Sequence, residues 1–451
     1  MLRRHGVVWL LALLHSSCTE HVRVGELGGE VPLDACMGKN THCDTGLASL
    51  PLAEPPSPEL TRAQCELEDD DTWRVAWSRE LTHLRCAPLG YCDATEIAFA
   101  EDGTFWAAGF GFTPVADTTD TLAGLFLTHY GSDGDVLASE VIDTVRLDEF
   151  EWIPSEVSLA PSSRGRVTVA TLWSDQGWVG EFDGKLQPVG ERVRLTGLSE
   201  EMNVGLSRNR DGDVYLIASD DRWMSTDSGE VAGPSVLAKL DSHLQPLWIQ
   251  SQALPGSHAQ ASLMTQQTPT LVAHNSVKLP ESTVGITTAR LIGTYDATGN
   301  LARMLALPLD VQPYGLDREG NVLALSADFV KPFRVSKLTP QGDVVFSVAV
   351  IDLPAPEHTP SFGALLDTDG TSYFAHRQLD GSTGRDLITL VRLSADGERC
   401  TRSHVVNEVP QLRQSSLELT DIVGVFKSES GDLYFRTETA IGRFAQGTKS
   451  Y

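Results

Sequence analysis

The side chains that could do chemistry in this sequence are its seven cysteines, its twelve histidines and the acidic residues of its turns. No cysteine or histidine pair has zinc-ligand spacing, and no C-x-x-C occurs. The groups Asn209, Asp211 and Asp213, and Asp367 and Asp369, loosely match a calcium loop but lack its downstream bidentate glutamate. Asp and Asn beside glycine are also what hairpin turns require. We therefore assign these residues to turns and expect no metal and no cofactor.

Residues 1–17 have the pattern of a secretory signal. A basic start precedes an apolar run from Val7 to Leu14 that is too short to span a bilayer, and small residues follow. Cys18 comes next, which resembles the bacterial lipoprotein signal, although His15 stands where an aliphatic residue is usual. The resemblance implies a lipid on Cys18 and a cell-envelope protein, periplasmic or in the outer membrane, that meets the membrane only through this anchor. An ordinary cleaved signal and a secreted protein are the alternative.

The remaining cysteines suit an oxidising compartment. If Cys18 carries lipid, an even number is left, as expected of a disulfide framework. Several connectivities are open. Proximity in sequence favours two small loops, and elimination then leaves one long-range pair. The candidates are Cys36 with Cys43, Cys86 with Cys92, and Cys65 with Cys400.

A short phrase with a glycine in a polar turn returns along the chain, for example LDREGNVLALS at 316–326 and FAEDGTFWAAG at 99–109. The turn glycines are Gly103, Gly165, Gly212, Gly320, Gly370 and Gly431. Four of the five intervals run from 47 to 62 residues, and the interval after Gly212 is 108. A degenerate copy at 261–275, with Pro269 near the missing glycine, fills the long interval. The sequence therefore contains seven copies.

A second strand–turn–strand phrase alternates with the first, as in SKLTPQGDVVFSVAV. Each unit is thus two hairpins, or four short strands, and stretches such as VYLIAS and FSVAV show the period of two typical of strands. Four-stranded units repeated at this period describe the blades of a β-propeller. The sequence predicts an all-β, seven-bladed β-propeller with four-stranded antiparallel blades.

The last copy contains only three clear strands before the chain stops. The segment 72–84 resembles the closing strand of the other copies, with Trp77 in the place of Trp248 and Phe346. We predict that it pairs with the strand around 441–445 as the outermost strand of the last blade, because an open edge is a liability. A surface strand packed on the outside is the alternative.

The phrase D-x-x-G-N/D-V-Y/L, followed by L-D/T-x-x-G/L-x-x-x-W/F, resembles the repeats of secreted bacterial seven-bladed propellers, including the NHL-like and SBBP-type families. The resemblance covers residues 72–451. It implies the fold, but such propellers include binding proteins, scaffolds, lyases and lactonases. The domains expected are a signal peptide at 1–17, a cysteine-containing, proline-rich acidic tether at 18–71 and the propeller at 72–451.

The net charge of −26 and the pI of about 4.8 argue against nucleic acid and anionic lipid as partners. We expect a monomer. Five tryptophans could line a ligand surface, although such residues more often pack between blades. They are Trp106, Trp173, Trp178, Trp223 and Trp248.

No linear motif identifies catalytic residues, which stay unknown. One hypothesis is a non-catalytic binding or scaffold module for a protein or glycan. The alternative is a lyase, lactonase or glycosidase with its site in the central channel, built from several blades.

Overall fold

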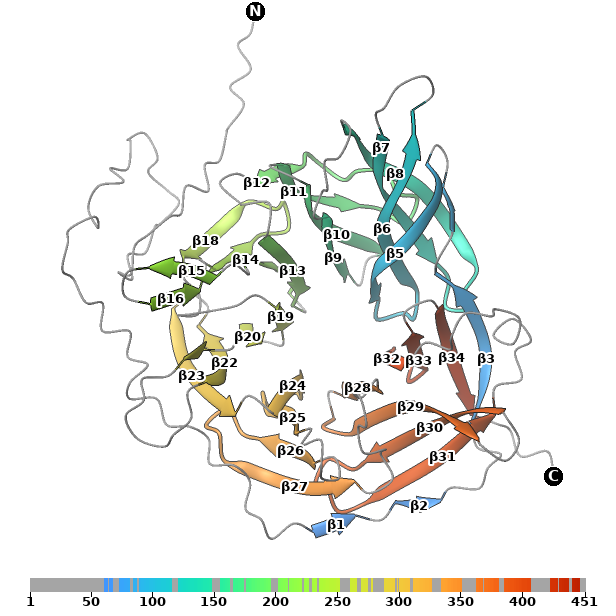
Figure 1. Ribbon diagram of the computed structural model, residues 1–451, viewed down its shortest axis with the longest axis vertical. Coiled ribbons are helices and arrows are strands. Elements are labelled where there is room, and N and C mark those ends of the chain that lie inside the picture. Colours follow the sequence, from blue (N-terminus) through green and yellow to red (C-terminus); the bar gives the residue numbers. More distant parts are fainter. Residues whose placement is uncertain are drawn as a thin grey trace, which may run out of the picture. The chain divides into compact units, whose positions relative to one another are not determined.

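The described part of the chain is built of β-strands. The computed structural model describes residues 61–446 with gaps, the longest of which are 252–259, 279–287, 351–361 and 407–421. No helix occurs in these described ranges. Their strands form seven four-stranded antiparallel sheets in series, the predicted fold of a seven-bladed β-propeller (Figure 1). No helix of the described residues is long and apolar enough to cross a membrane.

The chain forms two compact units. One includes Arg146–Leu309 and contains blades 2 to 4. Its strands are β9 (Ser155–Ser162), β10 (Arg166–Trp173), β11 (Gln176–Phe182) and β12 (Val193–Leu195) in blade 2; β13 (Met202–Arg208), β14 (Val214–Asp220), β17 (Ser235–Leu240) and β18 (Pro246–Ser251) in blade 3; and β19 (Gln260–Thr265), β20 (Pro269–His274), β22 (Thr288–Tyr295) and β23 (Leu301–Pro308) in blade 4. The hairpin β15–β16 (Trp223–Thr226, Gly229–Ala232) is an insertion in blade 3, and β21 (Val277–Lys278) pairs with β22. The predicted degenerate copy is the β19–β20 hairpin.

The other unit includes Ala53–Val115, Leu122–Val145 and Asp310–Tyr451 and contains blades 5, 6, 7 and 1. Its strands are β24 (Val311–Leu316), β25 (Val322–Ser326), β26 (Arg334–Leu338) and β27 (Val344–Val350) in blade 5; β28 (Phe362–Leu366), β29 (Ser372–Asp380), β30 (Arg385–Leu393) and β31 (Cys400–Val406) in blade 6; β32 (Ile422–Lys427), β33 (Leu433–Thr437), β34 (Ala440–Gln446) and β3 (Trp73–Glu80) in blade 7; and β5 (Gly90–Phe99), β6 (Phe105–Pro114), β7 (Thr121–Tyr130) and β8 (Val136–Leu147) in blade 1, which β4 (Leu84–Cys86) extends.

The hairpin turns show why the repeated glycines matter. All six predicted turn glycines have φ between +65° and +90°, the left-handed region that glycine enters without a Cβ penalty. Two turns between the third and fourth strands of a blade have leucine at the corresponding position: Leu186 with φ +63° and Leu244 with φ +58°. Both leucine side chains are buried. Burial offsets the backbone strain of a non-glycine residue in this region.

The second strand of a blade is buried on both faces. In β14, Val214, Tyr215, Leu216 and Ile217 are all buried, and so are the first seven residues of β6. The strand predicted from VYLIAS is present as β14, and both of its faces are buried because a propeller blade packs neighbours against both faces of its sheet. Outer strands such as β27 keep a mixed pattern.

The N-terminal strand β3 closes blade 7, as predicted. It pairs antiparallel with β34 from Trp73↔Gln446 to Glu80↔Ala440. In that ladder Trp77 lies opposite Arg443, just as Trp248 lies opposite Lys239 and Phe346 opposite Lys337. The register therefore shows β3 in the role of an outer strand. The predicted segment was too long, since Leu84 begins β4, which pairs with β5 of blade 1.

Residues 61–80, here called the N-terminal strap, also contact two other blades. Strand β1 (Thr61–Ala63) pairs parallel with β27 of blade 5, and β2 (Glu66–Leu67) pairs parallel with β31 of blade 6. Figure 1 shows β1 and β2 lying along these outer strands. Between them, Cys65 forms a disulfide with Cys400, the first residue of β31. The strap thus follows the outer strands of blades 5 and 6 before it completes blade 7.

Candidate functional site

At the turn between the first and second strands of a blade, polar side chains accept hydrogen bonds from backbone N–H groups of the same turn. The Asp317 carboxylate accepts the N–H groups of Glu319 and Asn321, each at 2.9 Å, and the Asn321 amide at 2.9 Å. In blade 3, Asn209 Oδ1 accepts the N–H of Asp213 at 2.9 Å. These are the bonds of a capped hairpin turn, which is the role that the sequence assigned to this class of residue.

A basic residue on the third strand of the blade reaches the same turns in blades 3, 5 and 7. The pairs are Lys239 with Asp213 at 2.8 Å, Lys337 with Asp317 at 2.6 Å, and Arg443 with Asp432 at 3.8 Å. Each cation also lies opposite the aromatic residue of the outer strand. The repeated unit is therefore an acid in the turn, a cation on the third strand and an aromatic ring beside that cation.

The Asp317–Lys337 pair in blade 5 is almost fully buried, with 3% and 7% of the side chains exposed. Burial alone would raise the pKa of Asp317, but hydrogen bonds from Lys337 and Asn321 outweigh it and hold this pKa below its usual value. The Lys337 ammonium also donates to the carbonyl of Ala395 in blade 6 at 3.4 Å. The pair therefore links two neighbouring blades.

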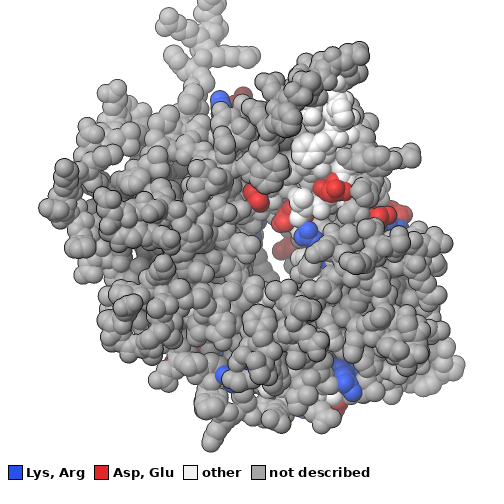
Figure 2. All heavy atoms as spheres, in the orientation of Figure 1, with Lys and Arg blue, Asp and Glu red and all other residues white. Residues whose placement is uncertain are grey.

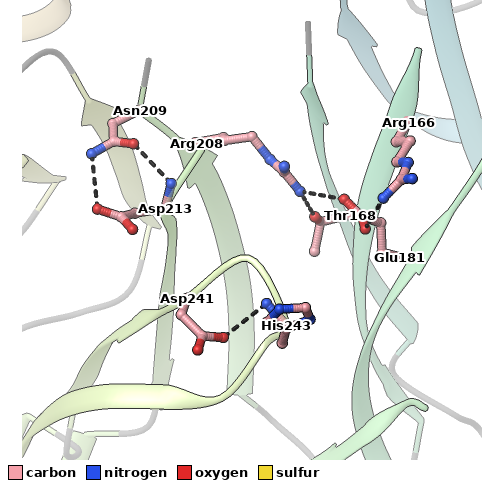
Figure 3. A network of polar contacts seen from close by, with 8 residues as sticks. All are labelled: Arg166, Thr168, Glu181, Arg208, Asn209, Asp213, Asp241 and His243. Carbon is pink, nitrogen blue, oxygen red and sulfur yellow. Dashed lines mark hydrogen bonds and ion pairs between the residues drawn. The ribbon is translucent and has the colours of Figure 1, made fainter. Parts of the chain in front are cut away.

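Blades 2 and 3 are joined by a network around a buried carboxylate (Figure 3). The Arg208 guanidinium, at the end of β13, donates to Glu181 Oε1 on β11 at 3.0 Å and to the Thr168 hydroxyl on β10. Arg166 donates to the other oxygen of Glu181 at 3.3 Å. Glu181 is 7% exposed and Arg208 11%, whereas Arg166 is 41% exposed. Two cations thus neutralise one buried acid.

A lysine at the same place in blade 7 also pairs with an acidic residue of the preceding blade. Lys427 is the last residue of β32, as Arg208 is of β13, and it pairs with Asp367 in the turn of blade 6. Its ammonium lies 5.4 Å from the centre of the Tyr373 ring. Burial would lower the pKa of Lys427, but the hydrogen bond to Asp367 and the acidic surroundings raise it. The ammonium therefore stays charged and holds the two blades together.

Aromatic rings join blades 7 and 1. Phe105 stacks on Tyr130 with ring centroids 4.5 Å apart, and Trp77 stacks on Phe105 at 6.0 Å. Phe99 contacts Phe426 at 4.7 Å, and the Tyr434 ring at 4.6 Å. The Tyr434 hydroxyl donates to the carbonyl of Gly103 at 3.3 Å, and Arg436 donates to that of Thr95 at 2.8 Å. Residues from both ends of the sequence make this joint.

The described tryptophans pack rather than line an open surface. Trp106 is fully buried and stacks on His129 at 4.0 Å, and Trp248 is 9% exposed. Trp178 is 8% exposed, with the Arg192 guanidinium 4.2 Å from its ring centroid. The side chains of Trp173 and Trp223 lie outside the described residues. These positions favour the packing interpretation of the sequence.

The structure locates some of the predicted cysteines. Cys65 is bonded to Cys400, and Cys92 on β5 is also disulfide-bonded. Its predicted partner, Cys86, ends β4 opposite Gly90, and the side chain of Cys86 lies outside the described residues. Cys18, Cys36 and Cys43 lie outside them too.

The ion pairs and ring contacts described above connect neighbouring blades. On the face drawn in Figure 2, the visible basic side chains of the described residues lie beside acidic ones. No group of three metal-ligating side chains gathers in the described ranges. The sequence did not predict a role for Glu181 or Arg208. Aligning the copies would have revealed Arg208, because a basic residue precedes the turn in both LSRNRDG and VFKSESG.

No protein-family model matches the sequence, and no curated protein matches it significantly. Solved structures with similar architecture are distant. The Dos1 propeller shares 11% identity over 81% of each chain, with a TM-score of 0.42. The acylaminoacyl peptidase of Pyrococcus horikoshii shares 9% over 81% of this chain and 54% of its own, at 0.42. The SapL1 lectin, solved with alpha methyl fucoside, shares 9% over 69% and 96%, at 0.37.

Proposed function

We propose that the chain is an exported β-propeller, lipid-anchored through Cys18, that serves as a non-catalytic binding or scaffold module for a protein or glycan. The observation that carries the proposal is the way in which the N-terminal strap is fixed. It pairs with blades 5 and 6 and is bonded covalently to blade 6 through Cys65 and Cys400. An N-terminal segment that runs from a membrane anchor and is cross-linked to the propeller is consistent with a protein held at a membrane surface.

The ion pairs support the binding role over the enzymatic one. Three acidic groups at the described joints, Glu181, Asp317 and Asp367, are each paired with a cation from their own or the next blade. A general acid or base needs a carboxyl group that faces the substrate with a pKa near the working pH. The pKa of Asp317 is instead held low by its partners.

The anchor is tested by expressing the full chain in a bacterium that processes lipoproteins. We expect the protein in the membrane fraction, with a mature N-terminus that begins at a lipid-modified Cys18 by mass spectrometry. A Cys18→Ser variant, as the matched control, should leave the membrane fraction while keeping its melting temperature. An unmodified mature N-terminus at another residue contradicts the anchor.

The binding role is tested separately on the purified, delipidated protein. A glycan array and cross-linking in envelope extracts should identify a saturable partner. Turnover of a lactone, a glycoside or an acidic polysaccharide, in the absence of a saturable partner, would instead favour the propeller enzyme.

A further inference from the structure

We infer that the outer edge of β8, residues 136–141, binds an extended basic segment of a partner protein by strand addition. This inference rests on the proposed binding function and names the class of its partner. Strand β8 has 12 residues and is the end strand of its sheet in the part of the chain that the structure describes. An end strand presents unpaired backbone groups that can pair with another chain.

The molecule already binds strands at such edges. The outer strands of blades 5 and 6 carry β1 and β2 of the strap, which pair with β27 and β31. These contacts show that the outer edge of a blade in this fold has room for an added strand. A partner strand on β8 would use the same backbone groups.

The other outer strands are protected in ways that β8 is not. Strand β12 has only three residues. Proline, which lacks an N–H donor, begins β18 at Pro246 and ends β23 at Pro308. Strand β3 contacts β31 at Arg74↔Val406. Strand β8 is the longest of the described strands and contains no proline.

The side chains along β8 define the partner. Val136 and Leu137 are 59% and 58% exposed, which is unusual for adjacent large aliphatic residues. Ser139 bonds to Thr128 of β7 at 2.8 Å, which places Leu137 and Val141 on that same face. The opposite face then carries Val136 and Glu140.

The charge of this edge favours a cation on the partner. Glu140 is exposed, as is Asp133 in the turn that precedes β8. Asp135 is paired with Arg79 at 2.9 Å and so contributes little. An added strand with alternating side chains that places aliphatic residues beside Leu137 and Val141 and a lysine or arginine beside Glu140 would make favourable cross-strand pairs.

The probe is a fluorescent peptide of about ten residues that alternates valine and lysine, with the glutamate version as control. Anisotropy measures its binding to the full chain. We expect the lysine peptide to bind and the glutamate peptide not to bind. Insertion of a proline at the centre of the lysine peptide should abolish binding, because the strand ladder loses a donor. Hydrogen exchange should slow at residues 136–141 when the peptide is bound.

Variants locate the site. Glu140→Lys should weaken the lysine peptide by about tenfold and allow the glutamate peptide to bind, since the cross-strand charge is inverted. Leu137→Lys should also weaken the lysine peptide. Val345→Lys, on the strand that β1 covers, is the matched control, because Val345 is an exposed aliphatic residue too and its change should leave binding as it was. Melting curves check that each variant is folded.

Two results overturn the inference. One is no binding of the lysine peptide up to about 1 mM. The other is binding that Glu140→Lys and Leu137→Lys leave unchanged, which would place the peptide elsewhere. Neither result affects the proposed function, whose anchor and binding role are tested by the separate experiments above.

Discussion

The joint between blades 7 and 1 and the joint between blades 2 and 3 are built from different chemistry. The first is a cluster of aromatic rings with a few hydrogen bonds. The second adds to its aliphatic core the buried Glu181 between two arginines. Tyr434 and Gly103 are 331 residues apart in sequence, whereas Arg208 and Glu181 are 27 apart.

The sequence separation explains part of this difference. Bringing together residues about twelve times further apart costs roughly 2 kcal/mol more in loop-closure entropy. Stacked rings provide a large buried apolar area, and each aromatic pair contributes about 1 kcal/mol beyond that area. A buried ion pair contributes little net free energy, because desolvation of the charges opposes their attraction. The joint that closes the chain is therefore apolar, and the local joint can be ionic.

Removal of the closing strand should have the largest effect. Three truncations that delete residues 18–60, 18–71 and 18–80 remove successively more of the strap. We expect the last to lose cooperative unfolding, because blade 7 then has an unpaired outer edge and the aromatic joint loses Trp77. Thermal melts followed by circular dichroism measure this. A melting temperature for the 18–80 deletion within about a degree of the 18–71 deletion would contradict closure by β3.

A single ring in the same joint should come next. Phe105→Ala removes a fully buried side chain that contacts three other rings and should cost about 3 to 5 kcal/mol of unfolding free energy. Phe112→Ala is the control, because Phe112 is on the same strand but 52% exposed, and its removal should cost less than about 0.5 kcal/mol. Urea unfolding compares the two. Equal losses would show that the closure joint does not depend on its rings.

The ionic joint should be less sensitive. Glu181→Gln keeps the shape of the side chain but leaves Arg208 without its carboxylate, and should cost about 2 kcal/mol. Arg166→Ala removes the exposed member of the network and should cost at most about 1 kcal/mol. If Glu181→Gln destabilised the protein more than Phe105→Ala, the contrast between the two joints would be wrong.

Acid should weaken the ion-paired joints before the aromatic one. The folded-state pKa of Asp317 lies below its ordinary value, so its pairing with Lys337 stabilises the protein above pH about 4 and is lost as the pH falls further. Unfolding of the wild type and Asp317→Asn between pH 7 and pH 3 tests this. The variant should be less stable at neutral pH, and the difference should shrink at the acidic end. A difference that is constant with pH would contradict the assignment.

The sequence by itself determined the strands, their turns and the number of blades. Glycine at one fixed position in six of the seven copies is a local requirement, because glycine adopts positive φ without strain, and the pattern can be recognised in a single sequence. The closing role of β3 could also be predicted from the sequence, because Trp77 stands where β18 has Trp248 and β27 has Phe346. The Cys65–Cys400 pair followed by elimination from the proximity of the other cysteines, and the structure contains this bond.

Only the tertiary structure decided which surfaces face one another. Burial of β14 on both faces, the pairing of Arg208 with Glu181 and the contact of Lys427 with Asp367 depend on a neighbouring blade. The strap strands β1 and β2 are too short to carry a sequence signal, and their parallel pairing depends on outer edges that exist only in the folded protein. Turn geometry is encoded within a few residues, whereas blade contacts join residues that are distant in sequence. Only the turn geometry can therefore be predicted from a single sequence.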